Sequence, residues 1–414
     1  APSKESGAGS ENLMINSYLS LMKSFLFAAL LISANLFAQD GRLSMGKLIE
    51  RNFQLAASQY KLLEKNTPDS LMPRFFDPAA NKAGTSNTKW WCSGFFPGSL
   101  LYIYEQTKDE EIRRIAEKRL AILEKEKYYT GNHDLGFMIY CSFGNAYRLL
   151  GKPEYKEAVM TAAGSLASRY RPAISSIQSW NSSDRLKCPV IIDNMMNLEL
   201  LYWVSDNGGD AKYRDIAVTH ANTTLKYHFR PDNSSYHVLD WDLEKKEIIK
   251  KITWQGAADS SAWARGQSWG LYGYTMMYRF SKDKAYLEQA KKIANYLLNH
   301  PNLPADKIPY WDFNAPGIPD TYRDASAGAV MASALLELGQ YVSKKEKKKY
   351  VGAAKQMLLS LSSNAYLTQP GENGGFLIKQ NVGSLPHKSE LKVSLTYADY
   401  YFLEAMLRYK NWYL

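Results

Sequence analysis

The sequence predicts an all-α fold, an (α/α)6 barrel of six helix hairpins. Two observations lead to this prediction. Twelve stretches have the periodicity of amphipathic helices, and the connections between them alternate between short polar turns and long segments. Short turns join antiparallel helices, and each hairpin then has a face that needs a neighbour. Closing six hairpins into a ring gives every face a partner.

Apolar residues at steps of three and four define the helices. The first shows the pattern in Ile49, Phe53, Ala56, Tyr60 and Leu63. The same reasoning predicts helices over residues 44–64, 93–107, 109–127, 134–150, 153–170, 193–205, 210–229, 259–281, 283–299, 322–342, 346–364 and 396–410.

The connections carry more information than any single helix. Gly, Pro and polar residues form short turns at 107–109, 151–153, 205–210, 281–283 and 343–345. Long segments lie at 65–92, 128–133, 171–192, 230–258, 300–321 and 365–395. The pattern puts the short turns on one rim of the barrel and the long segments on the other. An open helical solenoid is the alternative, and the irregular repeat lengths argue against it.

Composition fits one large globular domain. The chain has 414 residues, of which 45% are hydrophobic, and Lys plus Arg (51) exceed Asp plus Glu (41) to give a net charge of +10, which favours an anionic partner. Three widely spaced cysteines without a CxxC pair indicate neither a zinc site nor a disulfide framework. We expect a single catalytic domain over residues 39–414 that is a monomer or a weak homo-oligomer.

The N-terminal 38 residues have the composition of targeting sequence. Met22-Lys23 precedes an apolar run over residues 25–36 that ends in Phe37-Ala38-Gln39, the order found in a secretory signal. A buried helix is the alternative, and the run is too short to span a membrane. Residues 1–21 resemble an added leader or an overlong start. We therefore expect an exported, periplasmic protein.

The long-segment rim collects the residues that carry chemistry. Tryptophans, carboxylates, amides and Arg lie in these segments or in the helix turns that follow them, while the short turns hold mainly Lys, Asp, Gly and Ser. Such a mouth suits a sugar, whose apolar faces stack on rings and whose hydroxyl groups need directed hydrogen bonds. Packing of these rings as a plug at the barrel end is the alternative.

Asp134 and Asp193 are the leading candidates for catalysis. Each begins a predicted helix, so N-capping is a serious alternative for both. Asp193 stands between Pro189-Val190-Ile191-Ile192 and Met195-Met196, and apolar walls of this kind raise the pKa of a carboxyl group. A second carboxylate nearby would raise it further.

Arg265 and Trp269 lie four residues apart in a helix rich in Ala, Ser and Gly, so they share one face. A buried Arg needs a partner, which is either an acidic residue such as Asp259 or the carboxylate of a ligand. His237 and Gln255 could add hydrogen-bond donors, although a lone His is more often structural.

Other function classes are disfavoured. The sequence has no GxGxxG or GxxxxGK[ST] phosphate loop, no nucleophile elbow and no nucleic-acid-binding signature. The basic run at residues 344–349 fits a solvated turn and helix start. We expect neither a nucleotide nor a nucleic acid as partner.

Four motifs resemble the unsaturated glucuronyl hydrolases of glycoside hydrolase family 88, and the resemblance spans about residues 44–412. The motifs are His133-Asp134-Leu135-Gly136-Phe137, Asp193-Asn194-Met195-Met196-Asn197, the segment from Asp259 to Gly270, and Arg323-Asp324-Ala325-Ser326-Ala327. The resemblance implies an (α/α)6 barrel that acts without metal or organic cofactor. It also implies a substrate left by polysaccharide lyases, an anionic disaccharide with a 4,5-unsaturated uronic acid at its non-reducing end.

The resemblance also implies roles for individual residues. Asp193 would protonate C4 and then activate water, and Asp134 would hold the sugar and tune Asp193. The substrate-binding residues carried over from the family are His133, His237, Gln255, Arg265 and Trp269, with Trp90 or Trp91 and Trp180 as stacking walls. Arg265 would clamp the uronate carboxylate.

One segment, residues 383–394, departs from the form expected for the loop that holds the second sugar. Ser389, Lys392 and Ser394 are our candidates for a sulfate-binding group there. Glycosaminoglycan fragments are the expected substrates. The alternatives are an unsaturated rhamnogalacturonyl hydrolase acting on pectin fragments, a non-catalytic oligosaccharide-binding barrel and a sugar epimerase on the same barrel.

Overall fold

The helices differ in how much of their surface is buried, and this difference separates an inner from an outer ring. In the computed structural model, which describes residues 43–414, every residue of α11 (Ala325–Leu338) is buried. In α10 (Lys284–Asn299) the buried residues form one stripe that includes Tyr286, Ala290, Ile293 and Leu297. A helix that is apolar on all sides belongs inside, whereas one with a single apolar stripe covers the outside.

Within residues 43–414 the chain forms twelve α-helices. The inner ring consists of α3 (Phe95–Thr107), α5 (Asn145–Leu150), α7 (Leu198–Asp206), α9 (Ala264–Ser281), α11 and α13 (Thr396–Tyr413). A π-helical segment, η2 (Gly136–Gly144), leads into α5, and a 3-10 segment, η4 (Ile192–Asn197), leads into α7. The outer ring consists of α2 (Met45–Lys65), α4 (Glu110–Leu123), α6 (Pro153–Ala167), α8 (Lys212–Tyr227), α10 and α12 (Lys344–Leu361).

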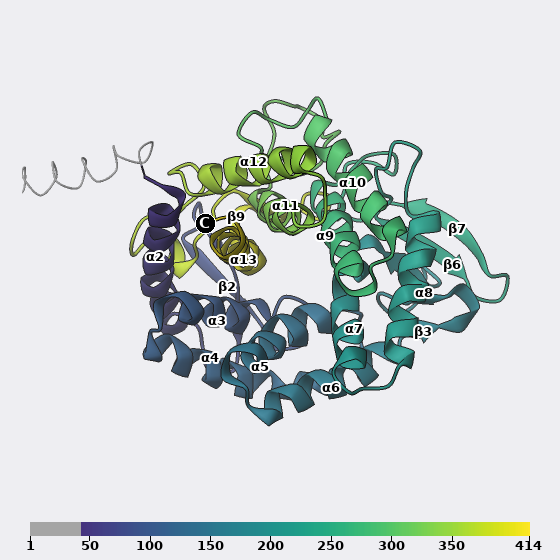
Figure 1. The fold of residues 1–414 in the computed structure, drawn as a ribbon, viewed down its shortest axis with the longest axis horizontal. Helices are drawn as coiled ribbons and strands as arrows, with labels where there is room; N and C mark the ends of the chain where they lie inside the picture. Colours follow the sequence, from purple (N-terminus) through teal and green to yellow (C-terminus); the bar gives the residue numbers. More distant parts are fainter. Residues whose placement is uncertain (1–42) are drawn as a thin grey trace, which may run out of the picture. The chain divides into compact units, whose positions relative to one another are not determined.

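The inner ring closes on itself within the compact unit Ile49–Leu414. Contacts run from α3 to η2, from η2 to α7, from α7 to α9, from α9 to α11, from α11 to α13 and from α13 back to α3. Figure 1 shows α10 and α12 outside α9 and α11. The closed ring is an (α/α)6 barrel, which confirms the predicted fold and rules out the solenoid.

The sixth helix pair is not a hairpin, and here the prediction was wrong in detail. Five pairs are joined by short turns at or near the predicted positions, the last of them at residues 339–343 and not 343–345. The helix α13 instead takes as its outer partner α2, which lies far from it in the sequence. The Tyr60 hydroxyl donates a hydrogen bond of 3.2 Å to Asp399, and the Asn52 amide donates one of 3.6 Å to the sulfur of Met406. Closing the ring brings together the first and last helices of residues 43–414.

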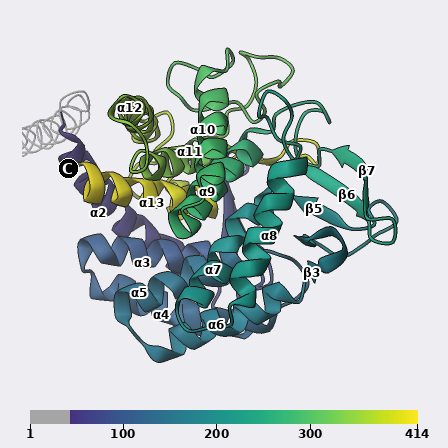
Figure 2. The same cartoon turned by 45° about the vertical axis from the view of Figure 1, so that its right-hand side comes forward.

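The long segments contain β-strands, which the sequence analysis did not predict. Strands β1 (Met72–Asp77), β2 (Lys82–Ser86), β8 (Asn381–Ser384) and β9 (Ser389–Leu395) form one antiparallel sheet in the order β2-β1-β9-β8. A second sheet has the order β5 (Pro189–Ile191), β6 (Val238–Asp242) and β7 (Glu247–Ile252), and β3 (Tyr170–Arg171) pairs with β4 (Ser176–Ile177). Figure 2 shows β5, β6 and β7 gathered beside α8.

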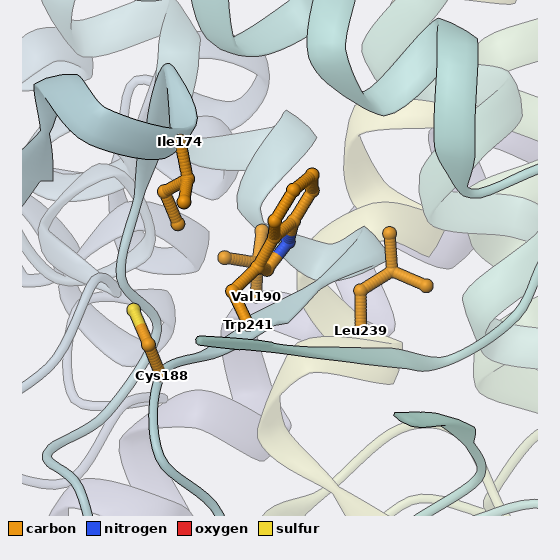
Figure 3. Packing of buried hydrophobic residues seen from close by; sticks show 5 residues of the cluster. All are labelled: Ile174, Cys188, Val190, Leu239 and Trp241. Atoms are coloured by element: carbon orange, nitrogen blue, oxygen red, sulfur yellow. The ribbon is translucent and has the colours of Figure 1, made fainter. Parts of the chain in front are cut away.

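A small apolar cluster fixes the second sheet and thereby the start of η4. Its buried members, shown in Figure 3, are Ile174, Cys188, Val190, Leu239 and Trp241. Strand β5 ends directly before η4, so the packing of β5 sets the position of the residues that follow.

Within residues 43–414, the structure contains no helix that is long and apolar enough to cross a membrane. The predicted leader and signal sequence, residues 1–38, lie outside the described residues.

Candidate active site

A cavity of about 370 Å³ opens among the long segments. Most of the predicted site residues line it, although they come from distant parts of the chain. The predicted residues in its wall are Trp90, Trp91, His133, Asp134, Trp180, Asp193, Gln255, Arg265 and Ser389.

Asp193 lies in the first turn of η4, and its side chain is 13% exposed. Burial raises the pKa of Asp193 to about 7; the charge of Arg265 lowers it, and the charge of Asp134 raises it. The Oδ2 atom has no hydrogen-bond partner. Asp193 can therefore hold a proton near neutral pH.

Asp134 immediately precedes the turn into η2 and is equally buried. Burial raises the pKa of Asp134 to about 7, and the charge of Arg169 partly offsets this rise. Neither η2 nor η4 has a side-chain cap, so the capping alternative fails for both aspartates. Two buried carboxyl groups of similar pKa thus share one cavity.

Each aspartate has a buried histidine beside it. His133 Nε2 lies 3.2 Å from Asp134 Oδ1, and His237 Nε2 lies 3.6 Å from Asp193 Oδ2. Burial lowers the pKa of both imidazoles to about 3. Both rings are therefore neutral at pH 7. His237 is absent from the cavity wall and lies behind Asp193.

Arg265 reaches the cavity wall from α9, but its partner is not Asp259. Its Nη1 atom lies 2.9 Å from Asp324 Oδ2, and its guanidinium also donates to the carbonyls of Val382 (2.6 Å) and Gly383 (2.7 Å). Asp259 instead accepts the backbone N–H of Thr253. Asp324 is the partner because it precedes the neighbouring inner helix α11, whose first turn it also caps.

Trp269 lies deeper than the resemblance implies. Its side chain is fully buried and packs against Phe137 and Tyr401 in the barrel core, outside the cavity wall. Hydrogen bonding from Trp269 nevertheless lowers the pKa of Asp193, although burial of that carboxyl outweighs the effect. Trp269 therefore acts on Asp193 from the barrel core and does not line the cavity.

The three candidates for a sulfate group do not come together. Ser389 lines the cavity, but Lys392 is exposed elsewhere on β9 and Ser394 is buried and accepts a hydrogen bond from the Asn373 amide at 2.6 Å. Alternate residues of a strand point to opposite faces, but the backbone at Glu390 and Lys392 has positive φ and breaks this alternation. Of the three, only Ser389 lines the cavity, and a sulfate-binding role of Lys392 and Ser394 stays a prediction.

The cavity wall also contains residues that the sequence analysis missed. Arg74 on β1 forms an ion pair with Glu390 on β9 (2.5 Å) and stacks over Trp90 at 4.2 Å. The other missed wall residues are Ile191, Trp254, Gly383, Ser384, His387 and Tyr397. Several of them carried a sequence signal: Trp254 stands among the rim tryptophans, Ile191 precedes Asp193, and Gly383, Ser384 and His387 lie in the segment 383–394 that is expected to hold the second sugar. Arg74 and Glu390 meet through a strand pairing between opposite ends of the chain.

A larger cavity of about 420 Å³ lies among the inner helices, near the ends that the short turns follow, and its wall includes Tyr102, Glu105, Arg148, Asn207 and Arg279. The short-turn side of the barrel therefore contains aromatic and charged side chains besides the Lys, Asp, Gly and Ser that the sequence predicts there. Its charges are already paired, with Arg279 2.9 Å from Glu199 and Arg408 3.4 Å from Glu404. The smaller cavity contains two carboxyl groups whose pKa values are raised to about 7, and it is the candidate active site.

Comparison with known proteins agrees with this geometry. The profile of Glycosyl Hydrolase Family 88 matches residues 65–413. The chain is 42% identical to an unsaturated glucuronyl hydrolase of Formosa agariphila, over 88% of this chain and 89% of the relative. It is 32% identical to an unsaturated chondroitin disaccharide hydrolase of Streptococcus pyogenes serotype M1, over 88% of this chain and 92% of the relative.

Solved structures give the same result. The crystal structure of an unsaturated glucuronyl hydrolase specific for heparin matches with a TM-score of 0.85 and 42% identity, covering 88% of this chain and 97% of that one. A variant of the Streptococcus agalactiae enzyme complexed with dGlcA-GalNAc6S matches with a TM-score of 0.77 and 30% identity, covering 90% and 94%. The chain belongs to glycoside hydrolase family 88 and is a hydrolase of the unsaturated glucuronyl type.

Proposed function

We propose that the enzyme releases 4,5-unsaturated glucuronic acid from the non-reducing end of glycosaminoglycan fragments produced by lyases. The observation that carries the proposal is the shared cavity of Asp193 and Arg265, in which a protonated acid stands close to a fixed positive charge. The substrates named for the relatives, chondroitin and heparin fragments, support the glycosaminoglycan class over pectin.

The reaction begins at the alkene. The C4=C5 bond of the substrate is an enol ether conjugated to a carboxylate, so protonation at C4 places positive charge on C5 and the ring oxygen. Asp193 donates this proton, water adds its oxygen to C5, and Asp193 accepts a proton from that water. The hemiketal then opens and the neighbouring sugar leaves with its own glycosidic oxygen. The ordinary glycosidase route, with an oxocarbenium at C1, is not needed.

The remaining wall residues hold the substrate. Arg265 supplies the positive charge that attracts the uronate, and Asp324 with two backbone carbonyls fixes the direction of its guanidinium. Trp90, Trp91 and Trp180 offer ring faces for the sugars. Gln255 is held by a hydrogen bond to the Gly383 carbonyl at 2.9 Å, which orients its amide beside the cavity.

The decisive variant is Asp193→Asn, which keeps the shape of the acid but removes its proton. We expect kcat on an unsaturated chondroitin disaccharide to fall by about 10²- to 10⁴-fold while substrate binding is retained. Loss of absorbance from the conjugated double bond measures turnover, and calorimetry measures binding. Unchanged turnover would refute the proposal, and an equal assay with an unsaturated rhamnogalacturonyl disaccharide tests the pectin alternative.

A matched control is Asp399→Asn. Burial also raises the pKa of Asp399 to about 7, but this carboxyl accepts the backbone N–H groups of Leu377 and Ile378, away from the cavity. We expect Asp399→Asn to lower stability and to leave kcat per folded molecule unchanged. A loss equal to that of Asp193→Asn would show that burial, and not position, explains the effect.

We also propose that the enzyme is exported to the periplasm. The charged, apolar and small-residue order over residues 22–38 supports export. Cell fractionation with sequencing of the mature N-terminus tests this, and an intact leader on cytoplasmic protein would contradict it.

A further inference from the structure

The two histidines beside the aspartates are fixed in opposite tautomers. The hydrogen bonds of His237 define one of them. Its Nδ1 atom accepts the backbone N–H groups of Trp254 (3.1 Å) and Gln255 (3.2 Å), so Nδ1 carries no proton. In a neutral ring the proton is then on Nε2, which lies 3.6 Å from Asp193 Oδ2.

The hydrogen bonds of Asn194 define the other tautomer. Its Nδ2 atom donates to the carbonyl oxygen of Ile177 at 2.7 Å, and a carbonyl oxygen can only accept, so the amide orientation is fixed. Its Oδ1 atom therefore faces His133 Nδ1, at 2.6 Å. His133 must carry its proton on Nδ1, which leaves a bare lone pair on Nε2, 3.2 Å from Asp134 Oδ1.

An ionised Asp134 would place two lone pairs against each other at this distance. A protonated Asp134 instead donates an O–H to His133 Nε2. From this geometry we propose, as a refinement that rests on the proposed function, that Asn194 and His133 are positioning residues that keep Asp134 protonated throughout the reaction. Asp193, which faces an N–H donor, is then the only one of the two aspartates that gains and loses a proton.

The assignment gives each aspartate a distinct task. A neutral Asp134 does not repel the uronate and serves as a hydrogen-bond donor or acceptor to the sugar. The N–H of His237 lies 3.6 Å from Asp193 Oδ2, beyond hydrogen-bond length, and its dipole favours the carboxylate that Asp193 becomes after it has protonated C4. Burial holds both imidazoles neutral, since it lowers their pKa values to about 3, and the positive charge of Arg169 further disfavours a charged His133. The other charged or titratable groups of the cavity wall are Arg74, Arg265, His387, Glu390 and Tyr397.

The chain contains its own reference signals. Among the four buried histidines of the described residues, His220 accepts the N–H of Ile177 on Nδ1, and His228 Nε2 faces the carbonyl of Val190 at 3.2 Å. Both of these rings are protonated on Nε2, as His237 is. His133 is then the single Nδ1–H ring of the four.

The experiment is a two-bond proton–nitrogen NMR correlation on the full enzyme labelled with ¹⁵N-histidine at pH 7, without substrate. His133→Gln and His237→Gln assign the two signals. We expect Nδ1–H for His133 and Nε2–H for His237, His220 and His228. A His133 ring that carries a proton on Nε2, alone or with Nδ1, would overturn the proposal.

A second measurement follows the Asp134 carboxyl carbon in enzyme labelled with ¹³C-aspartate, assigned through Asp134→Asn. In the wild type we expect this carbon to report a protonated carboxyl group at pH 6. Asn194→Leu frees His133 to turn into the Nε2–H tautomer, which donates to Asp134, so the pKa of Asp134 falls and its signal moves toward the ionised position. Ser179→Ala removes a 3.3 Å contact of the Asn194 amide and the 2.9 Å hydrogen bond from the Ile191 N–H, but it keeps the Ile177 carbonyl that orients Asn194, so we expect the Asp134 signal to stay unchanged.

An ionised Asp134 in the wild type at pH 6 would refute the proposal even if Asn194→Leu failed to fold. Both NMR measurements are made without substrate, so they are independent of the proposed activity. Absence of wild-type turnover on every unsaturated disaccharide would refute the function, whereas the wrong tautomer with normal turnover would refute only this refinement.

Discussion

At the scale of single residues, the charge of Arg265 and the proton of Asp193 are linked. The positive charge lowers the pKa of Asp193, although burial dominates and keeps that pKa near 7. If Asp193 must be protonated to act, kcat/KM falls as pH rises through the pKa of this group. Both residues were predicted from the sequence as a pair in one site, but the partner of Arg265 was not, because Asp324 follows 59 residues later on another helix.

Removing the charge of Arg265 therefore shifts the pKa of Asp193 in a predictable direction. Arg265→Gln should raise the pKa of Asp193 and move the alkaline limb of the kcat/KM profile to higher pH, along with a higher KM. Arg265→Lys keeps the charge but loses the forked hydrogen bonds. The alkaline limb of its kcat/KM profile should therefore stay at the wild-type pH, while KM rises. Profiles recorded between pH 5 and 9 decide this, and a limb that moves to lower pH in Arg265→Gln would contradict the account.

At the scale of elements, the strands supply part of the cavity wall that the helices do not form. The twelve helices could be predicted because their apolar periodicity is local, and the five short turns because Gly, Pro and polar residues mark them. The strands are short, and β1 pairs with β9 across most of the chain, through Phe75 with Leu395 and Phe76 with Ser394. No local sequence pattern predicts such a long-range pairing. The part of the cavity wall formed by Arg74 and Glu390 could therefore not be predicted from the sequence.

Gly383 in β8 allows the close approach of β9. A Cβ atom at this position would lie 2.3 Å from Glu390 Oε2 and 2.7 Å from Glu390 Cβ. The Gly383 carbonyl accepts hydrogen bonds from both Arg265 and Gln255. We expect Gly383→Ala to displace this carbonyl and raise KM, with an unchanged circular dichroism spectrum.

The control for this prediction is Gly352→Ala in the outer helix α12. A Cβ atom there would meet nothing within 4 Å. Alanine should stabilise the helix by about 0.5–1 kcal/mol, and KM should stay unchanged. Equal KM values for Gly383→Ala and the wild type would show that the β8 carbonyl does not position the substrate-binding groups.

At the scale of the whole molecule, the buried acid costs stability. The pKa of Asp193 rises from 3.8 to about 7 on folding, so between these values the folded state holds a proton that the unfolded state has lost. This term makes the free energy of unfolding fall as pH rises from about 4 to about 7. The buried histidines act in the opposite direction, because their pKa values fall to about 3.

Comparison of two proteins isolates the term from Asp193. Asp193→Asn keeps the same histidines, so their contribution cancels in the difference from the wild type. The variant should be more stable than the wild type above pH 7, and its advantage should shrink as pH falls toward 4. Urea unfolding across this range measures the difference, and a difference independent of pH would show that Asp193 is not kept protonated by the fold.

The ring itself followed from the sequence because alternating connection lengths constrain how helix pairs can neighbour one another. The pairing of α2 with α13 did not follow, because it depends on closure and not on any turn. Closure is also what brings the long segments together around Asp193 and Arg265.

The most direct measurement is the reaction of an unsaturated chondroitin disaccharide in D₂O, followed by proton NMR. Transfer of a solvent-exchanged proton from Asp193 predicts one deuterium at C4 of the first product, delivered to a single face, and none with Asp193→Asn. Release of the neighbouring sugar with the alkene intact in the first product would contradict the account.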